Sequence, residues 1–180
     1  LEITKHRGPD ATEIVKHVGG VFMFNRLSIM GLSDDGMQPF IFEGNILVAN
    51  AEIYNYPQIK EQMKDSYDFK SDSDCEVLLP LYKVLGLGMF ELLDAEFVCV
   101  LYDKEKETLV AARDPLGIRP LFYGYSKRDG SIIFSSEVKG IIDVVEKVIP
   151  FPPGHYYTEG VFTKYSRITD VKEYHDHTFD

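Results

Sequence analysis

Two uninterrupted apolar segments constrain the fold of this chain more than any other feature of its sequence. Residues 97–102 read Phe-Val-Cys-Val-Leu-Tyr, and residues 21–24 read Val-Phe-Met-Phe. Side chains of a strand alternate between two faces, so a strand that is apolar throughout must be covered on both faces. Two antiparallel sheets packed together, each with helices on its outer face, satisfy this demand. The sequence therefore predicts an α+β protein built as a four-layer αββα sandwich.

Ten short segments have the composition of strands. They span residues 20–25, 27–30, 40–43, 45–50, 96–103, 108–113, 121–125, 132–135, 155–158 and 161–165. Turn residues separate several of them: Glu43-Gly44-Asn45, Glu159-Gly160 and the run 127–130 each predict a tight hairpin.

Helical signals are fewer. Residues 56–64 are expected to form a short helix, with Asn55 as its cap and Pro57 in its first turn. Residues 74–85 place apolar side chains at helical spacing, with Ser73 or Asp74 as cap and Gly86 at the end. Shorter helical turns are expected over residues 88–93 and 136–145.

Composition narrows the class of protein. Hydrophobic residues make up 44% of the chain, and no linker divides it, so residues 1–180 are expected to form a single domain. The net charge of −10 argues against nucleic acid and anionic membranes as partners. No apolar run approaches the roughly 18–20 residues needed to span a bilayer. With only two cysteines, both in apolar segments, a reduced cytoplasmic setting is expected.

Metal binding and internal nucleophiles find little support. His175-Asp176-His177 could supply metal ligands but lies in a polar tail with no partner cluster. Asp72 and Asp74 lack the glycine and terminal glutamate of a calcium loop, so no metal site is expected. Cys75 and Cys99 have no obvious histidine partner and are expected to be buried core thiols.

Four polar residues adjoin the ends of predicted elements. Asn50 and Glu52 follow one strand, Arg26 follows another, and Asp74 opens the strongest helix. An arginine suits a ligand carboxylate, a carboxylate suits an ammonium, and an asparagine amide suits an oxyanion. Together they could hold a zwitterion, although each could equally be an ordinary cap or surface ion pair.

The same residues belong to a series of motifs. They are Arg7-Gly8-Pro9-Asp10, Arg26-Leu27-Ser28-Ile29, Glu52-Ile53-Tyr54-Asn55, Ser73-Asp74-Cys75-Glu76, Ala112-Arg113-Asp114-Pro115-Leu116-Gly117-Ile118-Arg119-Pro120-Leu121, Ser135-Ser136-Glu137 and Pro152-Pro153-Gly154-His155. In this order the series resembles the glutaminase domain of glutamine-hydrolysing asparagine synthetases. These are class II (type 2) glutamine amidotransferases with the N-terminal-nucleophile hydrolase fold. The resemblance covers nearly the whole chain and implies the four-layer αββα architecture.

The resemblance also implies a mechanism. In that family an N-terminal cysteine attacks the side-chain amide of glutamine with its own α-amino group as base, and a thioester then releases ammonia and glutamate. Carried over to this chain, Arg26 would bind the glutamine α-carboxylate, and Glu52 and Asp74 its α-ammonium. The side chain of Asn50 and the N–H of Ala51 would stabilise the oxyanion. No cofactor is expected in this domain, because ATP and Mg²⁺ belong to the synthetase domain.

Two departures from the family pattern bear on activity. The Cys-Gly-Ile start is absent, and Leu1 lies only a few residues before the Arg7-Gly8-Pro9-Asp10 motif, so the first strand is expected to be missing and this chain inactive. Ala51 and Ala95 stand where the family usually has glycine, and alanine at position 51 would distort the oxyanion site if positive φ were needed there.

Partners and alternatives follow from the resemblance. No Ser-Gly-Gly-x-Asp-Ser loop is present, so the C-terminal synthetase domain and its aspartyl acceptor are expected outside this chain. Two alternatives remain: a non-catalytic glutamine-binding module, and an amidotransferase with another acceptor. A homodimer is a further expectation, because exposed sheet edges favour association. Four other charged residues are interpreted as structural: Arg7, Arg113, Asp114 and Arg119.

Overall fold

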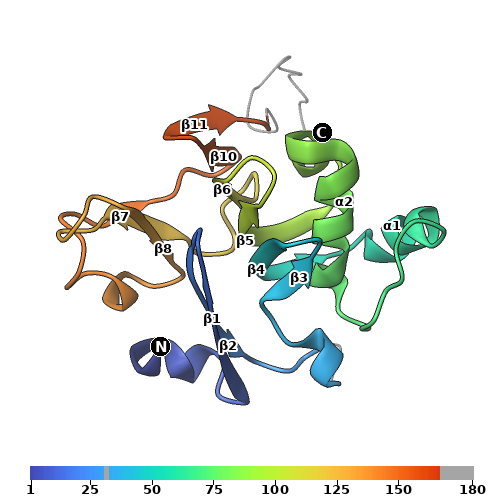
Figure 1. Cartoon of the computed structure of the whole chain (residues 1–180), viewed down its shortest axis with the longest axis horizontal. Helices are drawn as coiled ribbons and strands as arrows, with labels where there is room; N and C mark the ends of the chain where they lie inside the picture. Colours follow the sequence, from blue (N-terminus) through green and yellow to red (C-terminus); the bar gives the residue numbers. More distant parts are fainter. Residues whose placement is uncertain (31–32, 167–180) are drawn as a thin grey trace, which may run out of the picture.

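The computed structural model describes residues 1–30 and 33–166 of the chain, which form three antiparallel sheets. The central sheet has six strands in the order β11-β10-β6-β5-β4-β3 (Figure 1). Its strands are β3 (Phe40–Phe42), β4 (Asn45–Ile53), β5 (Ala95–Asp103), β6 (Thr108–Arg113), β10 (His155–Thr158) and β11 (Val161–Lys164).

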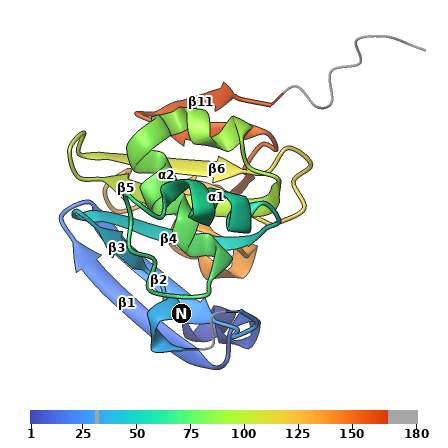
Figure 2. The same ribbon diagram turned by 90° about the vertical axis from the view of Figure 1, so that its right-hand side faces the viewer.

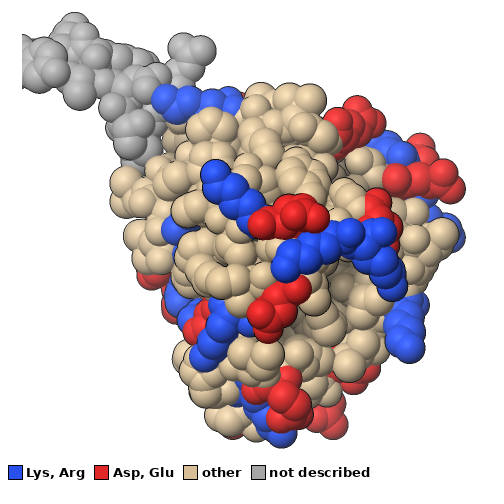
Figure 3. Space-filling view, turned by 90° about the vertical axis from the view of Figure 1, so that its left-hand side faces the viewer, with Lys and Arg blue, Asp and Glu red and all other residues tan. Residues whose placement is uncertain are grey.

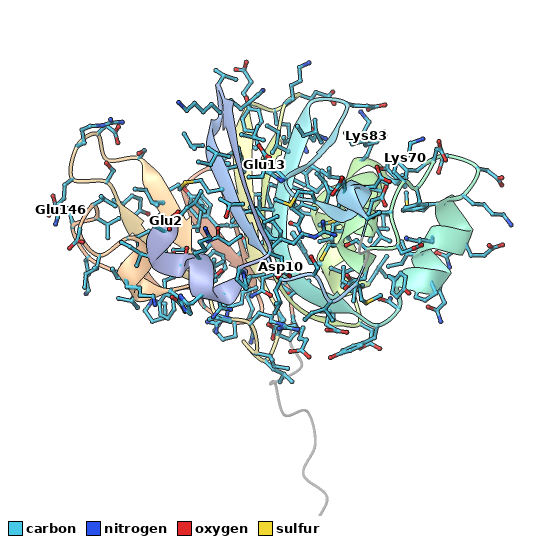
Figure 4. The ribbon with its side chains drawn as sticks, turned by 90° about the horizontal axis from the view of Figure 1, so that it is seen from below. Glu2, Asp10, Glu13, Lys70, Lys83 and Glu146 are labelled. Atoms are coloured by element: carbon cyan, nitrogen blue, oxygen red, sulfur yellow. The ribbon has the colours of Figure 1, made fainter. Side chains whose placement is uncertain are left out.

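Two smaller sheets pack on one face of the central sheet. One is the ribbon of β1 (Ala11–His17) and β2 (Gly20–Arg26). The other has the order β8-β7-β9, formed by β7 (Phe122–Tyr125), β8 (Ile132–Ser135) and β9 (Ile149–Pro150). In Figure 4 the ribbon, marked by Glu13, lies between the three-stranded sheet near Glu146 and the helical side near Lys70 and Lys83.

The helices cover the other face of the central sheet. The α-helices α1 (Tyr56–Met63) and α2 (Leu78–Leu85) lie in front of this sheet in Figure 2. Five 3-10 helices complete the described elements: η1 (Glu2–Arg7), η2 (Asp34–Gly36), η3 (Asp74–Val77), η4 (Gly86–Glu91) and η5 (Val138–Gly140). Of these, η1 contacts the residue before η5, because His6 of η1 is hydrogen-bonded to Glu137.

Strand β5 shows why residues 97–102 are apolar throughout. Phe97, Cys99 and Leu101 belong to the core cluster under the helices. On the opposite face, Val98 packs with the three-stranded sheet and Tyr102 with the β1–β2 ribbon. All five side chains are buried. The α+β class and the face-to-face packing of antiparallel sheets are therefore confirmed, whereas both α-helices of the described residues lie on one side of the central sheet and not on two outer faces.

Strand β2 behaves differently from the expectation. Phe22 is buried against Ile46 and Tyr102, but Val21 and Met23 on the other face are 56% and 51% exposed. The prediction that residues 21–24 are covered on both faces is therefore wrong for the described structure, because the ribbon packs through one face only.

Several element boundaries also differ from the prediction. Strand β1, η1, η2 and β9 were not predicted, and residues 27–30 form no strand. There the N–H of Ser28 donates to Asp10 and the N–H of Ile29 turns back to the Leu27 carbonyl. Strand β4 continues three residues beyond the predicted end. The segment 74–85 begins as a 3-10 helix, and 136–145 contains η5, turns and the single bridge residue Val145 in place of a longer helix.

The predicted capping roles are mostly wrong, whereas the turn residues are confirmed. Neither Asn55 nor Ser73 makes a side-chain cap, and Asn55 instead bridges the Leu92 carbonyl and the Asp94 N–H. Gly86, with φ of +56°, does end α2. The turn pairs Glu43-Gly44 and Glu159-Gly160 have positive φ at both residues, which suits the twist of a two-residue hairpin.

Surface charge on the face that carries β7 and β8 is mixed. Figure 3 shows acidic and basic side chains interspersed there among broad uncharged areas. In the described ranges, none of the helices has both the length and the apolar character needed to cross a bilayer.

Candidate functional site

Strand β4 carries three of the candidate residues inside its regular pairing with β5. Asn50, Ala51 and Glu52 lie opposite Val98, Phe97 and Glu96 in that order. Because side chains alternate along a strand, Asn50 and Glu52 share the face of β4 that the smaller sheets cover. The side chain of Asn50 makes no hydrogen bond to the residues described, so its amide is available to a ligand.

The N–H of Ala51 points to an unpaired position at the edge of β4. The N–H of Ala49 donates to Gln38 Oε1 (2.6 Å), and the N–H of Ile53 donates to Asp74 Oδ2 (2.8 Å). Alternate N–H groups of an antiparallel strand point to the same side, so the Ala51 N–H lies between these two acceptors and faces away from β5. Within residues 1–30 and 33–166 nothing accepts it. Sequence reasoning did not identify Gln38.

The backbone of Ala51 is unstrained. Its φ is negative, and the residue lies in regular strand pairing opposite Phe97. An alanine therefore offers its N–H here as well as a glycine would. The distortion of the oxyanion site that positive φ at position 51 would cause does not arise in this conformation.

Asp74 joins the same end of β4 from the helical side. It is buried at the start of η3 and, contrary to expectation, does not cap the helix. Its Oδ2 atom accepts the Ile53 N–H instead, which attaches the carboxylate to the strand that carries Asn50 and Glu52.

Arg26 is the last residue of β2 and is only 7% exposed. It shares the face of β2 with Phe22, so it points toward the central sheet. One of its terminal nitrogens donates to the Ser33 carbonyl at 2.9 Å. Strands β2 and β4 contact each other, so the face of β2 that carries Arg26 is turned toward the strand that carries Asn50 and Glu52.

A charged cluster that sequence reasoning missed adjoins Glu52. Arg119 lies 3.6 Å from Glu52 Oε2 and 3.4 Å from Glu96 Oε2, and the Tyr54 hydroxyl donates to Glu96 Oε1 at 2.6 Å. Glu52 and Glu96 are cross-strand partners, so Arg119 offsets the repulsion of two carboxylates directly opposite each other. No spacing in the sequence relates position 119 to position 52.

The loop before Arg119 is held by its own side chains. Asp114 is buried and accepts the N–H groups of Leu116, Ile118 and Arg119. Arg113 donates to the carbonyls of Gly117, Arg119 and Phe151. The structural interpretation of Arg113 and Asp114 is confirmed by these contacts. Arg7, for its part, pairs with Glu137 at 3.4 Å.

Both cysteines are buried, as expected. Burial, and after it the neighbouring Asp74, raises the pKa of the Cys75 thiol well above its usual value. Burial raises the pKa of Cys99 to about 12. Neither thiol supplies a thiolate near neutral pH, which a cysteine nucleophile requires.

Metal ligands do not gather in the part of the chain that the structure covers. In that part, no group of three or more His, Cys, Asp or Glu side chains is placed to hold an ion. The sequence His175-Asp176-His177 lies outside the described residues.

Asn50, Glu52 and the unpaired N–H of Ala51 thus lie on one stretch of β4, the Asp74 carboxylate is bonded to the end of that strand, and Arg26 ends β2. A family model described as a glutamine amidotransferase domain matches residues 1–162. The chain belongs to the glutamine amidotransferase family.

Relatives agree with this assignment, and a solved structure shares the fold. A probable glutamine-hydrolysing asparagine synthetase of Schizosaccharomyces pombe is 42% identical over 156 residues, which is 85% of this chain and 28% of that protein. An asparagine synthetase of Zea mays is 40% identical over 86% of this chain and 26% of its own length. The fold matches a glutamine phosphoribosylpyrophosphate amidotransferase from B. subtilis, with a TM-score of 0.69 and 22% identity over 82% of this chain and 35% of that one. This amidotransferase chain therefore spans little more than a quarter of the synthetases' length.

Replacing Ala51 with glycine is expected to lower the free energy of unfolding by about 0.5–1 kcal/mol, because glycine loses more backbone entropy in a strand. Denaturant titration measures this. Ala95→Gly is the matched control, since Ala95 lies on the neighbouring strand β5 opposite Ile53. A stability gain for Ala51→Gly alone would show that alanine strains the backbone at this position.

Proposed function

We propose that this chain is the glutamine-binding and glutamine-hydrolysing domain of a longer amidotransferase related to the asparagine synthetases. In this proposal Arg26 binds the α-carboxylate of glutamine, and Asp74 and Glu52 bind its α-ammonium. Asn50 and the N–H of Ala51 stabilise the oxyanion that develops when the amide carbon is attacked.

The observation that carries the proposal is the unpaired N–H of Ala51. It lies on the strand edge between two occupied positions, the Gln38 amide oxygen on one side and the Asp74 carboxylate on the other. A backbone donor fixed in a strand needs no reorganisation when charge develops on an oxygen beside it. The Asn50 amide, one residue away and without a partner among the described residues, supplies a second donor of the same kind.

The longer enzyme is proposed to use the released ammonia on a second domain. The synthetases that resemble this chain are more than three times its length, which leaves room for a synthetase domain with an aspartyl acceptor. ATP and Mg²⁺ are proposed to act there and not on this domain. An amidotransferase with a different acceptor would use the same glutamine site, because the roles proposed for these residues concern glutamine alone.

The attacking thiol is proposed to come from outside these 180 residues. Cys75 and Cys99 are both buried, and burial raises the pKa of each, so neither is suited to attack an amide. The 180-residue polypeptide is therefore expected to bind glutamine without hydrolysing it, which is also the behaviour of a non-catalytic glutamine-binding module.

Two measurements on the 180-residue chain test this. Isothermal titration calorimetry is expected to show one L-glutamine site, with a dissociation constant of about 0.1–1 mM, comparable to ordinary Michaelis constants. D-glutamine serves as the control ligand and is expected to bind more weakly. A coupled assay is expected to detect no glutamate release. Absence of L-glutamine binding would contradict the proposed site, and turnover would contradict the inactivity of this polypeptide.

A further inference from the structure

Glu76 is a buried carboxylate that the proposed site does not use. Its side chain accepts four hydrogen bonds: Oε1 from the Lys70 N–H (2.8 Å) and the Tyr67 hydroxyl (3.3 Å), and Oε2 from the N–H (2.8 Å) and hydroxyl (2.7 Å) of Ser71. Among the described residues no cation pairs with it. A buried charge is unfavourable unless hydrogen bonds replace its hydration, so these four contacts are what keep it there.

The contacts fix the turn that leads into Asp74. The Ser71 hydroxyl donates to Glu76 and at the same time accepts the Ser73 N–H at 3.1 Å. From the other side, the Lys60 ammonium donates to the Ser71 carbonyl at 2.7 Å. The backbone of residues 70–73 is therefore held on both sides immediately before Asp74.

Asp74 in turn lies against the end of β4. Its Oδ2 atom accepts the Ile53 N–H, which leaves the orientation of the other carboxylate oxygen dependent on where the Asp74 backbone sits. A shift of the preceding turn would move this oxygen with it, and misplacement by about 1 Å is enough to weaken a positioned contact strongly.

We propose that Glu76 is a positioning residue for the glutamine site: it fixes the turn of residues 70–73 and so holds the Asp74 carboxylate where it receives the ligand's α-ammonium. This inference rests on the proposed function, in which Asp74 binds that ammonium. It assigns to the last residue of the Ser73–Glu76 motif a role in ligand selectivity and not in chemistry.

A glutamine at position 76 cannot replace the carboxylate. Each oxygen of Glu76 accepts a backbone N–H, one from Lys70 and one from Ser71, and the amide NH₂ of a glutamine would face one of these donors in either orientation. Burial, and after it the Glu76 carboxylate, raises the pKa of Tyr67 to about 12. The Tyr67 hydroxyl therefore keeps its proton and remains a third donor directed at the side chain of residue 76. Glu76→Gln therefore disturbs the turn while hardly changing the volume of the side chain.

The test compares two ligands that differ only at the α-ammonium. Calorimetry of the 180-residue chain is carried out with L-glutamine and with glutaramate, which lacks the α-amino group. Glu76→Gln is expected to weaken glutamine binding about tenfold or more and glutaramate binding less than about twofold. Ser71→Ala is the milder second variant, because it removes only the hydroxyl that donates to Glu76 and accepts the Ser73 N–H. It is expected to weaken glutamine binding about threefold.

Tyr82→Phe is the matched control. It removes a hydroxyl that donates to buried Asp103 at the far end of β5, and is expected to lower stability without changing selectivity between the two ligands. If the Glu76 and Ser71 variants lost affinity for both ligands equally, or lost affinity for neither, the positioning role alone would be overturned. Failure of the unaltered chain to prefer glutamine over glutaramate would overturn the proposed ammonium site itself.

Discussion

Replacing Asp114 with alanine is expected to lower the free energy of unfolding by about 3–5 kcal/mol. Asp114 is 1% exposed, and its carboxylate accepts hydrogen bonds from three backbone N–H groups of the loop, those of Leu116, Ile118 and Arg119. Each orphaned donor costs about 1–3 kcal/mol, and water at this surface loop recovers part of the sum. A loss of this size is a large share of the ordinary stability of about 5–15 kcal/mol.

Chemical denaturation measures the loss, and two variants bracket it. Asp114→Asn keeps the size but places an NH₂ against one of the N–H donors, so a smaller loss of about 1–3 kcal/mol is expected. Asp143→Ala removes an exposed carboxylate that makes no hydrogen bond or ion pair with the described residues, and is expected to change stability by less than about 0.5 kcal/mol. An Asp114→Ala midpoint equal to that of the unaltered chain would show that the loop is held by other contacts.

The architecture could be predicted from the sequence because the composition of one strand, β5, requires that both of its faces be buried. Phe97 to Tyr102 are apolar at every position, and both sides of β5 are covered. The same argument failed for Val21 and Met23, because apolarity shows that a side chain tolerates burial and does not show what covers it. Strand β1 was missed because Glu13 and Lys16 interrupt its apolar pattern, although the ribbon pairs regularly across the turn before Gly20.

The sequence offers the candidate site residues one by one but not their arrangement, and their roles stay predictions. Asn50, Glu52 and Asp74 could be chosen from the sequence because they are polar residues at the ends of apolar elements, where such side chains can bind the charged groups of a ligand. Asp74 is attached to the strand of Asn50 and Glu52 by the bond from the Ile53 N–H, and neither spacing nor composition encodes a contact over 21 positions. Arg119 reaches Glu52 through a loop whose shape is set by buried hydrogen bonds, which no periodicity reveals.

Replacing Arg26 with methionine is expected to weaken glutamine binding by about 100-fold, which corresponds to the loss of one or two hydrogen bonds to a charged group. Methionine retains the apolar stem in a position that is only 7% exposed, so the change removes chiefly the guanidinium. Arg26→Lys keeps the charge but not the planar fork that matches a carboxylate, and is expected to weaken binding about tenfold.

Calorimetry with two ligands separates this effect from a general loss of structure. L-glutamine is compared with 4-aminobutanamide, which lacks the α-carboxylate, and only glutamine binding is expected to depend on Arg26. The bond from Arg26 to the Ser33 carbonyl is lost as well, so thermal unfolding of each variant is measured beside the titrations. Arg128→Met is the matched control, because Arg128 is an exposed arginine in the turn between β7 and β8 that pairs with Asp129. If folded Arg26→Met bound glutamine within about threefold of the unaltered affinity, Arg26 would not bind the α-carboxylate. Loss of a charge-assisted hydrogen bond to that carboxylate would weaken binding by more than threefold.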